Sequence, residues 1–172
     1  MFDGDYTLTG KHATCTKYLY ESGVFKRYID VYMNGAIFGF LYGRKAERDT
    51  TTNDRGRIYA DAFATERSRC DFIFRLIMLL DETQNCTAQE RIDRAFREDS
   101  LGGEAKDRNQ ELFHSYVRGG IEVLFEIFAE GCTSRDDFVT KMYEVVTDFE
   151  EELEGGKYTD RLREAMGDYI VG

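Results

Sequence analysis

Hydrophobic residues recur at helical spacing along most of this chain, most clearly over residues 135–153. There the apolar positions are separated by 4, 3, 4 and 4 residues, which places them on one face of a helix: Phe138, Met142, Val145, Phe149 and Leu153. Ser134 and Asp137 have the spacing of a capping box, and Gly155-Gly156 is a typical helix end. The pattern predicts a helix from Ser134 to the glycine pair.

The same periodicity predicts further helices over residues 104–130 and 56–81, a short one opened by Thr87 and Glu90, and a last one from Thr159 to Ile170. Gly119-Gly120 lies inside the 104–130 segment and is expected to weaken or bend that helix, because glycine disfavours helix interiors. The stretch Phe72–Leu80 is apolar on nearly all sides, so we expect it to be the most buried helix.

The first third of the chain also shows helical spacing, over Lys11–Ser22, with Thr9 as a possible cap, and over Val24–Arg48. Small residues four apart lie on one face of the second helix, namely Gly35, Gly39 and Gly43. Such a face favours a close helix crossing within the core, with a homodimer contact as the alternative. A second interpretation makes Tyr28–Phe40 a hairpin that turns at Asn34-Gly35.

The fold that these patterns predict is all-α, a single-domain helical bundle of about six or seven helices over residues 1–172. The absence of proline agrees with it, since helix interiors exclude proline. The longest apolar run, Val31–Gly43, is too short to span a bilayer. The start of the sequence has no secretory pattern, and the 4 cysteines are widely spaced. We therefore expect a cytoplasmic protein with reduced thiols.

Charge is divided unevenly along the chain. Residues 1–80 hold 12 Lys and Arg against 10 Asp and Glu, whereas residues 81–172 hold 11 against 23. A near-neutral half rich in Arg and Tyr is thus followed by a strongly acidic half. Such asymmetry concerns partners and solubility more than fold. This asymmetry suggests a protein that binds another macromolecule.

The leading functional hypothesis is a non-enzymatic interaction protein whose acidic half binds a basic partner protein. Charge complementarity of this kind speeds association and selects partners. The partner-binding residues would be Glu122, Glu126, Glu130, Asp148, Glu150, Glu151, Glu152 and Glu154. Nucleic-acid-handling proteins have the most basic surfaces in a cell, so we expect an inhibitor or regulator of one of them. Bacterial or phage nuclease inhibitors, including anti-CRISPR proteins, are often small, acidic and without motifs.

One alternative is direct nucleic-acid binding through an Arg/Tyr-rich N-terminal face. Guanidinium groups follow phosphates, and aromatic rings stack on bases. The candidate residues are Arg44, Lys45, Arg55, Arg57, Arg67 and Arg69. The net charge of −10 opposes this function at long range. A competing interpretation pairs these arginines with the acidic half of the same chain.

A helical metal-dependent enzyme is the second alternative. Glu111 and His114 have the Glu-x-x-His spacing of dimetal helix sites, but no second motif of this kind follows, so a surface Glu–His pair is the simpler interpretation. The acidic row of Glu122, Glu126 and Glu130 could face Glu144 and Asp148 around magnesium. No serine or cysteine nucleophile motif and no phosphate-binding loop is present. We therefore expect neither a cofactor nor catalysis.

Overall fold

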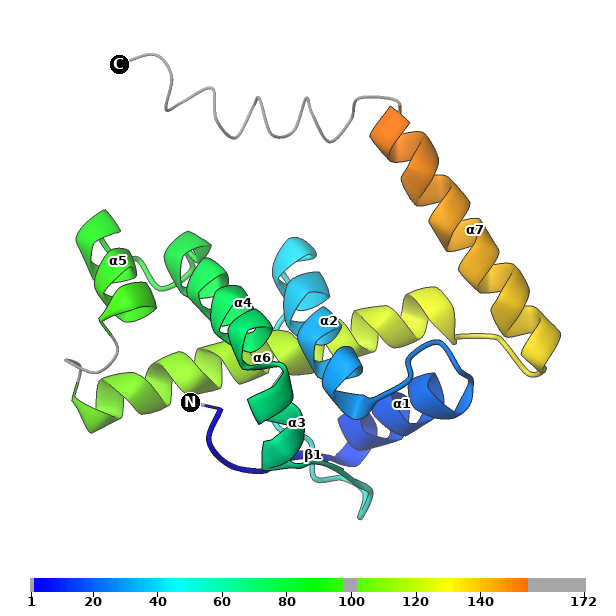
Figure 1. Ribbon diagram of the computed structural model, residues 1–172, viewed down its shortest axis with the longest axis horizontal. Helices are drawn as coiled ribbons and strands as arrows, with labels where there is room; N and C mark the ends of the chain where they lie inside the picture. Colours follow the sequence, from blue (N-terminus) through cyan, green and yellow to red (C-terminus); the bar gives the residue numbers. More distant parts are fainter. Residues whose placement is uncertain (1, 98–101, 155–172) are drawn as a thin grey trace. The chain divides into compact units, whose positions relative to one another are not determined.

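The computed structural model describes residues 2–97 and 102–154, with the side chains of residues 135, 149 and 152–154 left out. The expected helix Thr159–Ile170 lies outside these residues. The described chain is mostly helical, with one small sheet, so the predicted all-α class is confirmed (Figure 1). In chain order the elements are β1 (Tyr6–Thr9), α1 (Gly10–Glu21), α2 (Tyr28–Leu41), β2 (Arg55–Ile58), α3 (Ala60–Thr65), α4 (Arg67–Leu80), α5 (Ala88–Phe96), α6 (Gly103–Phe128) and α7 (Arg135–Glu154).

The chain divides into two compact units, residues 1–130 and 131–172. The single-domain organisation stays a prediction. In the first unit α6 is the central helix, and α1, α2 and α4 pack against it (Figure 1). Among the described helices, none is both long enough and apolar enough to cross a membrane.

The crossing of α2 and α6 brings the two backbones into direct contact. A Cβ atom on Gly120 would lie 1.7 Å from the carbonyl oxygen of Gly35, and one on Gly39 would lie 2.0 Å from that of Tyr116. A Cβ on Gly119 would meet the carbonyl oxygen of Arg44 at 2.2 Å. The glycine pair therefore permits a close crossing, and α6 continues through it as one helix of 26 residues. The pair does not interrupt the helix, because close packing against α2 offsets the low helix propensity of glycine; whether it weakens the helix stays a prediction.

Helix α2 begins at Tyr28 and ends at Leu41, so the predicted helix over Val24–Arg48 was too long and the hairpin was wrong. Its end is a Schellman motif. The N–H of Arg44 donates to the carbonyl of Gly39 (2.7 Å), and Gly43 has a positive φ of 61°. Gly43 therefore terminates the helix instead of extending the small-residue face. Gly35 and Gly39 confirm the intramolecular crossing, and α6 covers the surface that the alternative homodimer contact would use.

The sequence analysis predicted neither of two short strands, and the second of them, β2, takes the place of the start of a predicted helix. β1 pairs with β2 in antiparallel register, with Tyr6 opposite Ile58 and Leu8 opposite Gly56. The predicted helix over residues 56–81 thus begins later, at Ala60, and is interrupted at Glu66 between α3 and α4. A four-residue strand is too short for its alternation to stand out against helical spacing, and tertiary pairing decides its conformation.

The core of the first unit is aromatic. The ring of Phe2 lies 5.7 Å from that of Phe63 and 6.0 Å from that of Phe113, and the fully buried Tyr32 contacts both of these. Helix α4 contributes one face only. Its other face is exposed, with Phe72 at 65% exposure, so the expectation that Phe72–Leu80 would be the most buried helix was wrong.

Both predicted capping boxes are confirmed. The Thr87 hydroxyl accepts from the Glu90 N–H (3.2 Å), and Glu90 accepts from the Thr87 N–H (2.7 Å) at the start of α5. Ser134 and Asp137 exchange the equivalent bonds before α7, at 3.2 and 2.8 Å. Backbone N–H groups of Thr133 and Ser134 lower the pKa of Asp137 to about 2. Thr9 occupies the N-cap of α1, but its hydroxyl donates to the carbonyl of Asp49 instead of capping the helix.

Candidate functional site

Glu122, the first residue of the predicted acidic row on α6, is enclosed by basic side chains of its own chain. Its carboxylate lies 2.8 Å from Lys11 Nζ, 2.9 Å from His12 Nε2 and 3.1 Å from Arg44 Nη2, and its side chain is only 12% exposed. Burial acts to raise the pKa of Glu122, but hydrogen bonds from Lys11 and His12 lower this pKa below its ordinary value. The charge of Glu122 is therefore neutralised locally and joins α1 to α6.

The other two residues of that row are more exposed than Glu122. Glu126 pairs with Arg44 Nη1 at 2.6 Å and is 44% exposed. Glu130 is exposed at the end of α6 and makes no ion pair with the described residues. The row predicted as one partner surface thus divides into two internally paired carboxylates and one that has no cation beside it in the described chain.

Helix α7 carries further acidic side chains that have no cation beside them in the described chain. Asp148, Glu150 and Glu151 are exposed and form no ion pair with the described residues. Glu144 has one weak contact, 3.9 Å from Lys141 Nζ. The side chains of Glu152 and Glu154 lie outside the described part. Repeated carboxylates on an exposed helix produce a local negative field, which is the property that the acidic-docking hypothesis requires.

An apolar row on α7 was missed by the sequence analysis. Val139, Tyr143 and Val146 are 54–73% exposed, whereas Phe138, one position before the first of them, is buried. Their spacing of 4 and 3 residues places them on one side of the helix, next to the predicted apolar stripe. The sequence contains this row one position after the predicted stripe, so the two rows together form a wider apolar face on α7.

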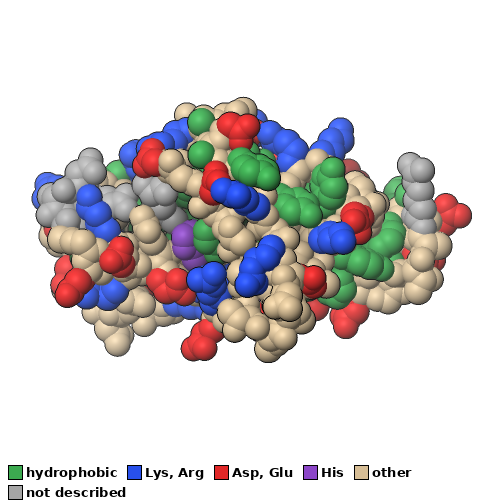
Figure 2. Space-filling view, turned by 90° about the horizontal axis from the view of Figure 1, so that it is seen from below, with side chains coloured by type: hydrophobic (Ala, Val, Ile, Leu, Met, Phe, Trp, Pro, Cys, Tyr) green, Lys and Arg blue, Asp and Glu red, His purple; other side chains and the backbone are tan. Residues whose placement is uncertain are grey.

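The basic residues proposed for nucleic acid are largely paired within the protein. Ion pairs link Arg57 with Asp5, Arg67 with Asp3 and Asp71, Arg69 with Glu66, Lys45 with Asp81, and Arg44 with Glu122 and Glu126. Arg55 donates to the carbonyl of Asp54 (3.2 Å). Intramolecular pairing was therefore expected correctly, but most partners belong to the N-terminal half and not to the acidic one. Figure 2 shows basic and acidic side chains intermixed on one face of the protein.

Glu111 and His114 do not form the expected surface pair. Glu111 bonds to the Arg118 guanidinium, while His114 lies 3.1 Å from the Tyr32 hydroxyl and stacks on the Tyr6 ring at 4.3 Å between centroids. Burial and the nearby Arg118 charge lower the pKa of His114 to about 3, so its ring is neutral near pH 7. Within the described residues, no group of three or more His, Cys, Asp or Glu side chains is placed to hold a metal ion.

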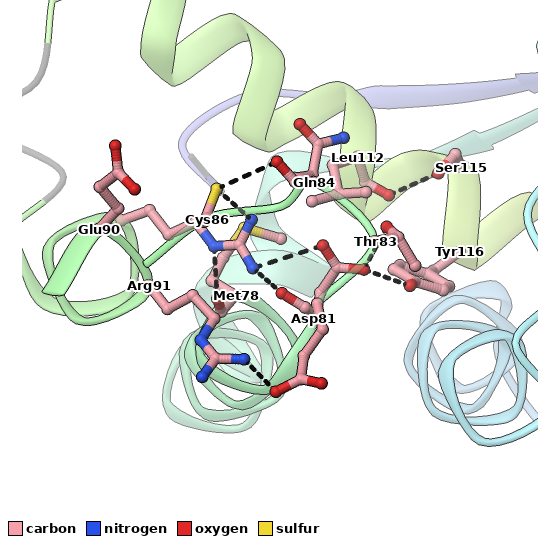
Figure 3. Close-up of polar contacts among 12 residues, drawn as sticks. Met78, Asp81, Thr83, Gln84, Cys86, Glu90, Arg91, Leu112, Ser115 and Tyr116 are labelled. Carbon is pink, nitrogen blue, oxygen red and sulfur yellow. Dashed lines mark hydrogen bonds and ion pairs between the residues drawn. The ribbon is translucent and has the colours of Figure 1, made fainter. Parts of the chain in front are cut away.

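A buried polar network joins the α4–α5 connection to α6 (Figure 3). Asp81, whose side chain is fully buried, accepts from the Tyr116 hydroxyl (2.6 Å) and the Thr83 hydroxyl (2.7 Å). Arg94 Nη2 lies 3.3 Å from the Asp81 carboxylate, and Arg94 Nε donates to the Met78 carbonyl at 2.5 Å. Hydrogen bonds and nearby cations lower the pKa of Asp81 despite its burial. The buried charges are thus paired and hydrogen-bonded, so the network has the properties of a structural element.

Comparison with known proteins gives no match: no family model, curated protein or solved structure is similar to this chain.

Proposed function

We propose that this chain is a non-enzymatic helical interaction protein whose acidic helix α7 binds a basic, nucleic-acid-handling partner protein as its inhibitor or regulator. The observation that carries the proposal is the set of exposed carboxylates on α7 that form no ion pair within the described chain, Asp148, Glu150 and Glu151. Carboxylates already paired inside a protein offer little to a partner, whereas unpaired ones attract an opposite surface. An inhibitor of a nuclease, including the anti-CRISPR type, is the specific form of this proposal.

The apolar row of Val139, Tyr143 and Val146 supports the same surface. A helix that combines exposed apolar side chains with a charged flank suits a groove on another protein. Tyrosine is enriched among the residues that contribute most to binding energy at interfaces. Tyr143, at 73% exposure, would be the main apolar contact, and the carboxylates would orient the complex.

A charge-reversal experiment tests the proposal. The triple variant Asp148→Lys/Glu150→Lys/Glu151→Lys should lose capture of basic protein from nuclease-treated lysate at low salt. The matched control reverses Glu47, Glu104 and Asp107, three exposed carboxylates of the first unit that form no ion pair with described residues, and changes net charge equally. Capture that survives the α7 triple, or that both variants lose alike, would contradict the assignment to α7.

Direct nucleic-acid binding has less support, because five of its six candidate residues are in ion pairs with carboxylates. Each phosphate contact made by one of these five residues would have to replace an existing ion pair. An electrophoretic shift with RNA or single-stranded DNA at low salt would revive this alternative.

A further inference from the structure

Strand β1 borders a small polar pocket that the proposed function does not use. The pocket has a volume of about 260 Å³ and is lined by Tyr6–Thr9 together with Arg48, Glu111, His114 and Arg118. No residue of β2 lines it, so it lies on the side of β1 away from β2. A volume of this size admits a small molecule or the end of a chain.

Two guanidinium groups line this pocket, and they differ in burial and in bonding. Arg118 is almost completely buried; its Nε donates to the Ala46 carbonyl (2.8 Å), and its Nη2 bonds to Glu111. Arg48 is exposed and makes no ion pair with the described residues. Burial raises the pKa of Tyr6, and the charges of Arg118 and Arg48 both act against that rise. Both cations line the same pocket as Tyr6.

The charge of the pocket favours a monoanion. Arg48 and Arg118 contribute two positive charges, Glu111 contributes one negative charge, and His114 is neutral near pH 7. The net charge of the lining is thus +1. A planar carboxylate fits the donor fork of an arginine and balances this charge, whereas a phosphate dianion would exceed it.

The free edge of β1 supplies main-chain groups beside these cations. Gly10 N–H donates to the Asp54 carbonyl (3.2 Å), which continues the ladder in the register Tyr6–Ile58 and Leu8–Gly56. Because ladder bonds alternate along an antiparallel strand, the backbone groups of Thr7 point away from β2. An extended amide can pair with such an edge.

We propose that this pocket binds the carboxylate of an acylated amino acid or of a peptide C-terminus, with Arg48 receiving the carboxylate and the Thr7 backbone pairing with the preceding amide. The site does not depend on the proposed function, because it uses no residue of α7. Glu111 competes for Arg118, so its carboxylate limits the affinity of the site.

Calorimetric titration of the full chain tests the site with three probes: acetyl-Ala-Ala-Ala as the free acid, the same peptide as the C-terminal amide, and acetate. We expect the free acid to bind at least about tenfold more tightly than the amide, because a charge-assisted bond is lost. Acetate should bind more weakly than the free acid and reveals how much the carboxylate contributes alone. Equal binding of acid and amide, no binding at low millimolar concentration, or acetate as tight as the peptide would overturn the proposal.

Variants and a local readout separate the site from general charge effects. Arg48→Gln should weaken binding of the free acid about tenfold, and Glu111→Gln should tighten it. Lys17→Gln is the matched control, since it removes the same charge from an exposed side chain that does not line the pocket and whose ion pair, with Glu21 (3.8 Å), lies on the surface. In amide NMR spectra the free acid should shift the Thr7 resonance. An unchanged affinity of Arg48→Gln, or an unmoved Thr7 resonance at saturation, would overturn the assignment.

Discussion

At the scale of single residues, Gly120 determines how closely α2 and α6 approach. The Gly35 carbonyl oxygen occupies the space that a side chain would need, since a Cβ atom on Gly120 would lie 1.7 Å from it. We expect Gly120→Ala to lower the free energy of unfolding by more than about 2 kcal/mol, because the atom that the new Cβ would meet belongs to the backbone. Urea denaturation measures the loss.

Gly103 provides the matched control in the same helix. It begins α6, and a Cβ atom added there would meet no described atom within 4 Å, so Gly103→Ala should be neutral or stabilise by up to about 1 kcal/mol. Equal effects of the two substitutions would contradict the role of the close crossing.

His114 makes stability depend on pH. Its folded pKa of about 3 lies below the ordinary value of 6.5, so between these values the unfolded chain binds more protons than the folded chain. Lowering pH from 6.5 to 5 should therefore reduce the free energy of unfolding, with a limit of about 1.4 kcal/mol per pH unit for this group. Burial also lowers the pKa of His12, which adds in the same direction.

The measurement is urea denaturation at several pH values between 7 and 5, on the native chain and on His114→Gln. The variant should show a shallower pH dependence, and His12 should account for part of the remaining slope. Identical slopes for both proteins would exclude a neutral His114 as their source.

The sequence pattern identified polar residues at the site, but it did not identify the residues to which they bond. The spacing of Glu111 and His114 predicts one helical face, yet each residue bonds elsewhere, to Arg118 and Tyr32. Tyr32 lies 82 positions from His114 along the chain. Helical periodicity reports local neighbours only, so a bond across such a distance could not be predicted from the sequence.

At the scale of elements, α5 depends on Arg94. This side chain connects α5 to the buried Asp81 and to the Met78 carbonyl at the end of α4. Arg94→Leu should lower the free energy of unfolding by about 3 kcal/mol or more, because it leaves a buried carboxylate with fewer partners. In hydrogen exchange, α5 should lose protection before α6 does.

Arg97→Leu is the comparison for that experiment, since the Arg97 side chain is 65% exposed and its ion pair with Asp93 (3.1 Å) lies on the surface. Its effect should stay within about 0.5 kcal/mol. A similar loss in both variants would show that helix charge and not the buried network holds α5.

Elements with strong local signals were predictable, and those made by distant contacts were not. The capping boxes of α5 and α7 involve residues three apart, so the sequence contains the whole motif. Strand β1 exists because it pairs with β2, some fifty residues later. The last part of the expected Val24–Arg48 helix instead passes α6, where the Ala46 N–H donates to the Ser115 carbonyl (2.9 Å).

At the scale of the whole molecule, charge differs between the two units. Residues 1–130 hold 18 Lys and Arg against 22 Asp and Glu, and residues 131–172 hold 5 against 11. Much of the first unit's charge is in ion pairs, whereas the exposed carboxylates of α7 mostly have no cation beside them in the described chain. The sequence predicted the acidic half, but it could not show which carboxylates are already paired.

A fragment ending at Glu130 tests whether the first unit folds alone. It contains the aromatic core, the α2–α6 crossing and the sheet, so we expect a cooperative thermal transition and the near-ultraviolet circular dichroism of packed aromatic rings. It should also lose the partner capture that we propose for α7. A fragment without a cooperative transition would show that residues 131–172 complete the core.

The crossing of α2 and α6 also determines when the protein can fold during synthesis. Gly35 and Gly39 leave the ribosome long before Tyr116 and Gly120, the residues that they contact. At cellular rates of translation the intervening chain takes about 4 to 15 s to make. Throughout that interval the face of α2 that α6 covers in the folded protein has no partner, so the nascent chain has to be kept from aggregation until α6 emerges.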